Sequence, residues 1–333
     1  MTSTPTPAQT GRRVPPRYAG APVIEVRDLH MSYGPTRVLE GVSFSAARGE
    51  VVALLGPNGA GKSTTIEILE GFRMRSAGQV SVLGVDPPQG DETWRAGIGV
   101  VLQSWRDHGR WRVRQLLEHL GGYYRPYSTA ERPRPVDAGE LLAMVGLTEF
   151  ADRRVSTLSG GQRRRLDVAI GIVGRPEVLF LDEPTAGFDP HARREFHDVV
   201  HRMSDFESTT VLLTTHDLAE AEKLADRILI LAGGRIVANG SADELSRQVA
   251  GRTEVRWSIG GERFVHAAED GTAFTRELFE EHGERVAELE VRRATLEDTY
   301  LEMVQRYENR PSDGPRVDAG EAEKLRADFG GAA

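Results

Sequence analysis

The chain has 333 residues, enough for one large domain and a smaller one, and its 39% hydrophobic and 28% charged residues are typical of a soluble globular protein. A net charge of −8 does not favour binding to a nucleic-acid backbone, and the absence of cysteine excludes disulfides and thiolate metal sites. The sequence has neither an apolar stretch of membrane-spanning length nor an N-terminal secretory signal, so we expect a cytosolic protein.

The N-terminal part of the chain is predicted to pass from disorder into strands. Residues 1–20 are rich in Thr and Pro and are expected to form a disordered tail. Residues 23–27 and 42–45 alternate between apolar and polar side chains, as half-exposed strands do. Residues 51–55 are all apolar, which is typical of a strand buried on both faces.

A phosphate-binding loop follows this buried strand. The segment fits the pattern G-x-x-x-x-G-K-[ST] and consists of Gly56, Pro57, Asn58, Gly59, Ala60, Gly61, Lys62, Ser63 and Thr64. Its glycines let backbone N–H groups turn towards an anion, and the helix predicted to follow adds a partial positive charge. The chain has only three lysines and uses Arg almost everywhere else, so Lys62 indicates a position that needs a compact ammonium. The sequence therefore predicts binding of a nucleoside triphosphate.

Polar residues follow several further apolar strands. Gln103 comes after residues 98–102, Asp182 and Glu183 come after residues 178–181, and His216 comes shortly after residues 210–213. Because ligands bind at the carboxyl ends of parallel strands, we expect these side chains to converge on the phosphate loop. Between the first two strands, residues 104–157 are predicted to be mainly helical.

The composition changes near residue 250. Residues 253–259 alternate as a strand, and residues 275–282 and 294–304 have helical patterns. These features predict a small C-terminal accessory domain over 246–308, followed by a flexible tail over 309–333.

A glycine-rich segment completes the set of motifs and identifies a family. Leu158 to Gln162 (LSGGQ) precedes an apolar-periodic helix, and Asp182, Glu183 and His216 follow it in order. In the order and spacing of these motifs, residues 23–243 resemble the ATP-binding subunit of an ABC transporter. The resemblance implies an α/β fold, with a P-loop NTPase (ABC ATPase) core, an antiparallel β subdomain and a helical subdomain. The ATPase domain would cover 21–245 and its helical subdomain about 104–165, with the small α/β extension after it.

The resemblance also assigns roles to single residues. Asp182 would hold Mg²⁺ together with Ser63 and Gln103, and Glu183 would polarise the water that attacks ATP. His216 would contact the γ-phosphate, and Tyr33 would stack on adenine. The residues expected to bind the ATP of an opposite subunit are Ser159, Gly160, Gly161, Gln162 and Asp189. This arrangement in trans implies a homodimer, or a heterodimer with a related chain.

The C-terminal segment refines the resemblance. Residues 294–304, and the arginines after the glycine-rich segment, resemble exporter ATPases of the daunorubicin-resistance type. Such proteins pair with a separate ABC-2-type permease and export drugs, antibiotics, lipids or polysaccharides, which would place this chain on the inner face of the cell membrane. An importer ATPase and a soluble ABC ATPase unrelated to transport remain the alternatives. The three arginines themselves, Arg163, Arg164 and Arg165, are predicted to lie on a solvated helix face, with a place near the phosphates or the partner left open.

Overall fold

The computed structural model describes residues 21–101, 108–185, 188, 190–207, 209–249, 253–268, 270–293, 297, 300 and 304. Two of the predicted site residues, Gln103 and Asp189, lie outside the described residues.

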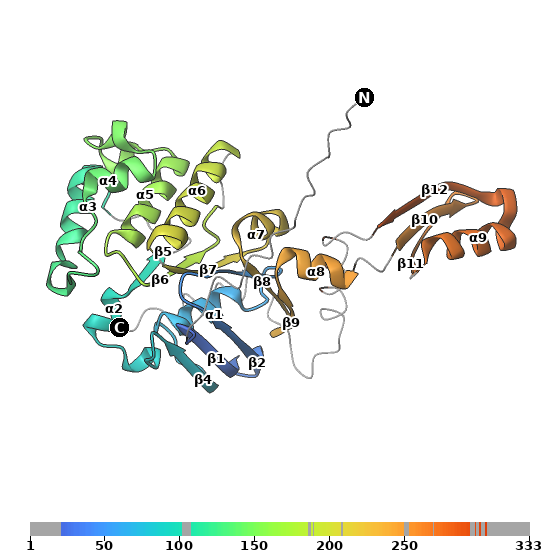
Figure 1. The fold of residues 1–333 in the computed structure, drawn as a ribbon, viewed down its shortest axis with the longest axis horizontal. Helices are drawn as coiled ribbons and strands as arrows, with labels where there is room; N and C mark the ends of the chain where they lie inside the picture. The colour runs from blue at the N-terminus through green and yellow to red at the C-terminus, as the bar shows by residue number, and fades with distance from the viewer. Residues whose placement is uncertain are drawn as a thin grey trace, which may run out of the picture.

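A six-stranded sheet forms the centre of the molecule (Figure 1). Its order is β5-β6-β7-β3-β8-β9. Five of the strands are parallel, and β9 runs antiparallel to β8. The strands are β3 (Val51–Leu55), β5 (Ile98–Val101), β6 (Val178–Asp182), β7 (Thr210–Thr215), β8 (Arg227–Ala232) and β9 (Arg235–Gly240). The apolar runs predicted as buried strands therefore lie side by side, as a parallel sheet covered on both faces requires.

The alternation of side chains along these strands divides the core into two layers. In β3, Val51, Ala53 and Leu55 belong to one apolar cluster, whereas Val52 and Leu54 belong to another. Because successive side chains of a strand point to opposite faces, the two clusters fill the two faces of the sheet. The sheet is thus packed on both sides, and its strand ends remain for polar residues.

Helices cover the first face. Side chains of α3 (Val113–Gly122), α4 (Ala138–Met144), α5 (Gly160–Ile172), α6 (Pro190–Glu207), α7 (Leu218–Leu224) and α8 (Ala242–Val249) join the cluster that contains Val51. Helices α3 and α4 fall within residues 104–157, which were predicted to be mainly helical, and α5 is the helix predicted to follow the glycine-rich segment. Helices α3 to α6 stand together in Figure 1.

A second, antiparallel sheet and two helices cover the other face. The sheet has the order β2-β1-β4 and is built from β1 (Ile24–Tyr33), β2 (Thr36–Ala46) and β4 (Ala77–Val82). Its apolar side chains pack with those of α1 (Lys62–Leu69) and with Trp94 of α2 (Glu92–Ala96) in the cluster that contains Val52. This sheet is the antiparallel β subdomain that the sequence predicted.

A small α/β unit follows the central sheet in the chain. It contains β10 (Thr253–Ile259), β11 (Glu262–Ala268), α9 (Gly271–His282) and β12 (Val286–Arg293), with the strand order β11-β10-β12. The predicted strand and helix are present, and β11 and β12 are additional. Trp257 stacks on Phe264 at 5.6 Å and contacts Phe274 of α9 at 5.5 Å between ring centroids. These aromatic contacts join α9 to β10 and β11.

Two residues beyond β12 return to the central core. Tyr300 and Val304 are buried members of the cluster that contains Val51. They are part of the segment predicted to be helical, and their spacing of four residues places both on one face of a helix. This part of the 246–308 range therefore packs against the helix-covered face of the central sheet.

The part of the chain that the structure describes contains no helix with both the length and the apolar character that crossing a membrane would require.

The packing of α5 on β5 yields a test of the fold. A Cβ atom added to Gly99 would lie 2.2 Å from the carbonyl oxygen of Gly171, which is backbone and has little room to move. We expect Gly99→Ala to lower the free energy of unfolding by about 1–3 kcal/mol in denaturant titrations. Gly122→Ala is the control, because nothing lies within 4 Å of its added Cβ and alanine favours the helix. Equal effects of the two substitutions would contradict the packing.

Candidate active site

The phosphate-binding loop connects β3 to α1 in a conformation that its glycines permit. Gly59 and Gly61 have φ angles of 82° and 103°, values that side chains other than glycine rarely adopt. A Cβ atom on Gly56 would lie 2.3 Å from the carbonyl oxygen of Leu231. The loop therefore approaches β8 too closely for any residue larger than glycine at position 56.

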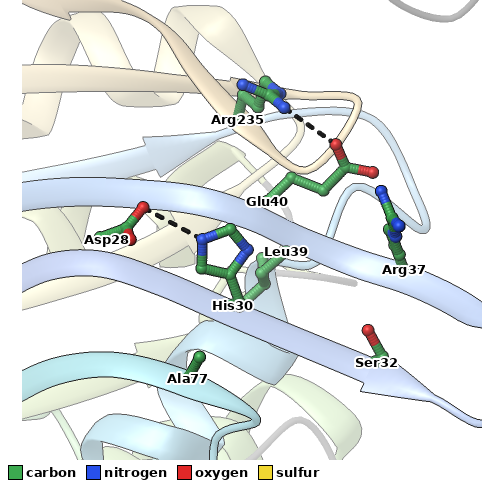
Figure 2. Close-up of a pocket in the computed structure, with 8 residues that line it drawn as sticks. All are labelled: Asp28, His30, Ser32, Arg37, Leu39, Glu40, Ala77 and Arg235. Carbon is green, nitrogen blue, oxygen red and sulfur yellow. Dashed lines mark hydrogen bonds and ion pairs between the residues drawn. The ribbon is translucent and has the colours of Figure 1, made fainter.

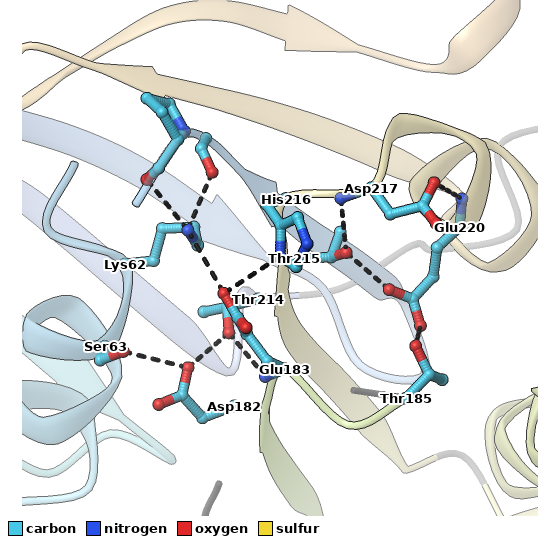
Figure 3. A network of polar contacts seen from close by, with 12 residues as sticks. Lys62, Ser63, Asp182, Glu183, Thr185, Thr214, Thr215, His216, Asp217 and Glu220 are labelled. Carbon is cyan, nitrogen blue, oxygen red and sulfur yellow. Dashed lines mark hydrogen bonds and ion pairs between the residues drawn. The ribbon is translucent and has the colours of Figure 1, made fainter. Parts of the chain in front are cut away.

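Lys62, the first residue of α1, reaches back over this loop. Its Nζ donates to the carbonyl oxygens of Gly56 at 2.8 Å and Pro57 at 3.0 Å, and lies 3.6 Å from Glu183 Oε1 (Figure 3). Burial lowers the pKa of Lys62, and the carboxylates of Glu183 and Asp182 oppose that effect. The ammonium is thus held by neutral carbonyls and acidic partners, in a place where phosphate oxygens can replace them.

Asp182 ends β6 next to the start of α1. Its Oδ1 accepts hydrogen bonds from Ser63 Oγ at 3.2 Å and from Thr214 Oγ1 of β7 at 2.6 Å. A carboxylate beside a hydroxyl is the oxygen donor set that Mg²⁺ prefers, so these two predicted metal ligands fit that ion. Thr214 was assigned no role from the sequence, although it lies at the end of the same apolar strand whose polar residues were expected to converge on the phosphate loop.

Glu183 follows in a left-handed backbone conformation. Its φ is 45°, which for a residue other than glycine costs about 1–3 kcal/mol. The backbone N–H of Glu183 donates to Thr214 Oγ1 at 3.0 Å, and His216 Nδ1 lies 3.4 Å from Glu183 Oε1. The turn therefore brings the Glu183 carboxylate between Lys62 and His216, as the strand-end argument predicted.

A buried carboxylate ties these strand ends together from behind. Glu220 of α7 is 3% exposed and accepts hydrogen bonds from the hydroxyls of Thr185 and Thr215 (Figure 3). Asp217 caps α7 by accepting from the backbone N–H of Glu220, and its own N–H donates to Thr215 Oγ1. Glu220 thus joins the segment after Glu183 to the segment before His216. The sequence analysis missed it, because the residue belongs to a helix rather than a strand end.

The prediction for the three arginines of α5 was wrong. Arg164 is 7% exposed, and the side chains of Arg163 and Arg165 are 17% and 18% exposed, so none lies on a solvated face. Arg163 Nε lies 3.4 Å from Asp167 Oδ1, and Arg165 Nη1 donates to Glu195 Oε2 at 2.9 Å. The spacing of four residues that puts Arg164 in line with the buried Val168 and Ile172 was the available signal.

The glycine-rich segment forms the start of α5. Within the part of the chain that the structure describes, it takes no part in the network around Lys62 and Glu183. Ser159 caps the helix: Gln162 N–H donates to Ser159 Oγ, and Ser159 N–H donates to Gln162 Oε1. Ser159 and Gly160 are exposed, and nothing lies within 4 Å of a Cβ added to Gly160 or Gly161. This helix N-terminus is open to an anion from outside the chain.

Tyr33 lies where β1 ends, near the phosphate loop. Its hydroxyl is 3.4 Å from Thr64 Oγ1, and the guanidinium carbon of Arg73 lies 5.0 Å from its ring centroid. A cation therefore covers one face of the ring.

A separate groove lies on the antiparallel sheet (Figure 2). A hydrogen bond between Asp28 and His30 at 3.0 Å and an ion pair between Glu40 and Arg235 at 3.0 Å line it. None of the residues predicted to bind nucleotide contributes to it, so the groove is distinct from the strand-end site.

A further carboxyl group is buried beside the site. Glu70, at the end of α1, has a buried Oε2 atom without a hydrogen-bond partner among the described residues. Burial raises the pKa of Glu70 to about 8, and the charges of Asp182 and Glu67 add to the effect.

Comparison with known proteins agrees with this geometry. A family model described as "ABC transporter" matches residues 39–186. A Nod factor export ATP-binding protein I of Rhizobium meliloti is 42% identical over 219 residues, which cover 65% of this chain and 64% of that relative, just under two thirds of its length. A daunorubicin resistance ATP-binding protein of Streptomyces coeruleorubidus is 40% identical over 228 residues, which cover 68% of this chain and 71% of that relative. A solved ATP-binding subunit of an ABC transporter is 31% identical with a TM-score of 0.59, covering 68% of this chain and 92% of that one.

The raised pKa of Glu70 predicts a dependence of stability on pH. Between its ordinary value of 4.5 and about 8, the unfolded chain ionises Glu70 while the folded chain keeps it protonated, so this group destabilises the fold as pH rises. We expect Glu70→Gln to raise Tm relative to wild type at pH 8. The difference in Tm between the two proteins should become smaller towards pH 5. Glu118→Gln, at an exposed position of α3, controls for the loss of one charge. Parallel Tm curves for wild type and Glu70→Gln would contradict the prediction.

Proposed function

Because this chain belongs to the family of ABC transporter ATP-binding subunits, which are ATPases, we propose that it powers an exporter through a separate ABC-2-type permease. The convergence of Lys62, Asp182 and Glu183 beside the phosphate loop carries the ATPase part of the proposal, and the names of the export and resistance relatives support the exporter part. Phosphoryl transfer needs positioned charges more than covalent chemistry, and this strand-end site supplies them.

In this proposal the phosphate loop and its neighbours bind ATP. Lys62 and the loop N–H groups hold the phosphates, and adenine stacks on the face of Tyr33 opposite Arg73. Asp182 and Ser63, with Gln103, would hold Mg²⁺. That ion, when bound, neutralises negative charge on the phosphates.

Glu183 orients the attacking water. Its carboxylate accepts a hydrogen bond from the water, whose oxygen forms a bond to the γ-phosphorus as the bond to the bridging oxygen breaks. ADP leaves with the bridging oxygen, and the proton of the water ends on the inorganic phosphate. His216, whose ring is 3.4 Å from Glu183, donates a hydrogen bond towards the γ-phosphate.

A second copy, or a related chain, completes the site. The open N-terminus of α5 is suited to bind the γ-phosphate of ATP held by the partner, through Ser159, Gly160, Gly161 and Gln162. Asp189 would contribute to the same interface. ATP would then close the dimer, and its hydrolysis would release it.

Export is the direction that the relatives support. The names of the Nod factor and daunorubicin resistance relatives both describe ATP-binding proteins of export or resistance systems. By analogy, this chain would act on the cytoplasmic side of the membrane, bound to its permease, and would drive efflux of a drug, antibiotic, lipid or polysaccharide. An importer would differ in depending on a substrate-binding protein.

Replacing the proposed catalytic carboxylate gives the first test. We expect Glu183→Gln to bind ATP with an affinity close to wild type, because the side chain remains polar and isosteric. Turnover should fall at least a hundredfold, a typical effect of losing such a group, and the ATP-bound dimer should persist in size-exclusion chromatography. Hydrolysis at a rate near that of wild type would overturn the assigned role of Glu183.

The permease gives the second test. Pull-down of the tagged chain from native membranes solubilised in mild detergent should recover a multi-helix membrane protein that stimulates ATP hydrolysis severalfold. The recovered proteins are identified by mass spectrometry. The same pull-down after salt-washing of the membranes controls for non-specific binding. Recovery of the chain without a membrane protein would count against the exporter, and recovery of a substrate-binding protein would indicate an importer.

A further inference from the structure

Arg164 reaches from the helical subdomain to the end of the catalytic strand. It lies in the second turn of α5 and is 7% exposed. Its Nε donates to the carbonyl oxygen of Pro184 at 2.9 Å, and its Nη2 donates to those of Asp182 at 3.0 Å and Glu183 at 3.3 Å. One guanidinium therefore binds three successive carbonyls of the turn that carries Glu183.

This turn is the strained part of the site. β6 ends at Asp182, so the carbonyls that follow leave the sheet, and buried carbonyls require donors. Glu183 has the left-handed φ of 45°, a conformation that persists only where its surroundings hold it. The planar guanidinium of Arg presents its donors in a fixed fork, which suits several acceptors in one turn better than a flexible ammonium does.

The next arginine along the helix, Arg165, binds other elements of the fold. Arg165 Nη1 donates to Glu195 on α6, and its other acceptors are the carbonyls of Val145 and Gly146. Two adjacent arginines of one helix thus point to different elements, and one of them binds the catalytic turn.

We propose that Arg164 is a positioning residue that holds the backbone turn of Glu183 and so aims its carboxylate at the attacking water. The inference rests on the proposed function, in which Glu183 orients that water. Arg164 binds backbone carbonyls of the turn, whereas the carboxylate of Asp182 is held by Ser63 and Thr214, and Lys62 and the phosphate loop hold ATP from other elements. Loss of Arg164 therefore lowers kcat and leaves the affinity for ATP nearly unchanged.

Four variants of the full-length chain test the proposal beside wild type. Arg164→Met keeps much of the side-chain length without donors, and Arg164→Lys keeps a donor without the fork. Arg165→Gln is the matched control on the same helix, and Glu183→Gln reports on the proposed function itself. Steady-state ATP hydrolysis gives kcat and KM, fluorescent-nucleotide binding gives Kd, and thermal denaturation gives Tm.

We expect kcat of Arg164→Met to fall about ten- to a hundredfold, as a small misplacement of a catalytic group does, with KM and Kd within about twofold of wild type. The kcat of Arg164→Lys should lie between those of wild type and Arg164→Met. The kcat, KM and Kd of Arg165→Gln should stay within about twofold of wild type. If Arg164→Met does not fold, Arg164→Lys decides: a severalfold lower kcat at unchanged Kd supports the proposal, and an unchanged kcat overturns it.

Different outcomes would overturn the role of Arg164 and the proposed role of Glu183. An inactive Glu183→Gln with a kcat of Arg164→Met equal to that of Arg165→Gln would overturn the role of Arg164 alone. A rise in KM and Kd that parallels any loss of kcat would also overturn it, because a general disturbance of the fold affects binding as well. An active Glu183→Gln would instead overturn the proposed function on which the inference rests.

Discussion

The site depends on the register of neighbouring parallel strands. That register places Thr214 beside Asp182, where the two side chains form a hydrogen bond. Asp182 is paired with Thr214 in the ladder of β6 and β7, and Leu55 is paired with Thr215 in the ladder of β3 and β7. The phosphate loop follows Leu55, so β7 brings it level with the carboxylates. A slip of one residue would turn Asp182 to the opposite face and separate it from Ser63. The apolar contacts on both faces of the sheet therefore fix the positions of the polar residues at the carboxyl ends of its strands.

This dependence explains which parts of the site the sequence could predict. Lys62, Asp182, Glu183 and His216 all follow or adjoin apolar runs, and the sequence pattern locates the ends of such runs. Parallel pairing then brings those ends together without further information. The strands at 23–27 and 42–45, the helix-rich region and the phosphate loop were predictable because local patterns specify them, whereas the antiparallel pairing of those strands was implied by the family resemblance.

The contacts that the sequence did not reveal are hydrogen bonds between residues far apart in the chain. They are made by charged residues that lie buried on helices. Arg164 occupies an apolar face of α5, and a run of three arginines favours the opposite prediction, a solvated face. Glu220 sits among charged neighbours in α7, and only the folded chain shows that it faces the hydroxyls of Thr185 and Thr215. Likewise four of the eight residues of β12 are charged, so its apolar pattern is weaker than the continuous apolar runs of the central strands.

Helix α5 links the two kinds of site residue. Ser159 caps its exposed end, and Arg164 binds the turn of Glu183 from its buried face. The two residues are about 7 Å apart along the axis of one continuous helix, at roughly 1.5 Å per residue. In the proposed dimer, a shift of this helix when Ser159 meets the partner's ATP would also move the guanidinium that holds Glu183. Because a hydrogen-bonded helix moves as a unit, the geometry at one chain's catalytic carboxylate would then depend on the nucleotide bound by the other.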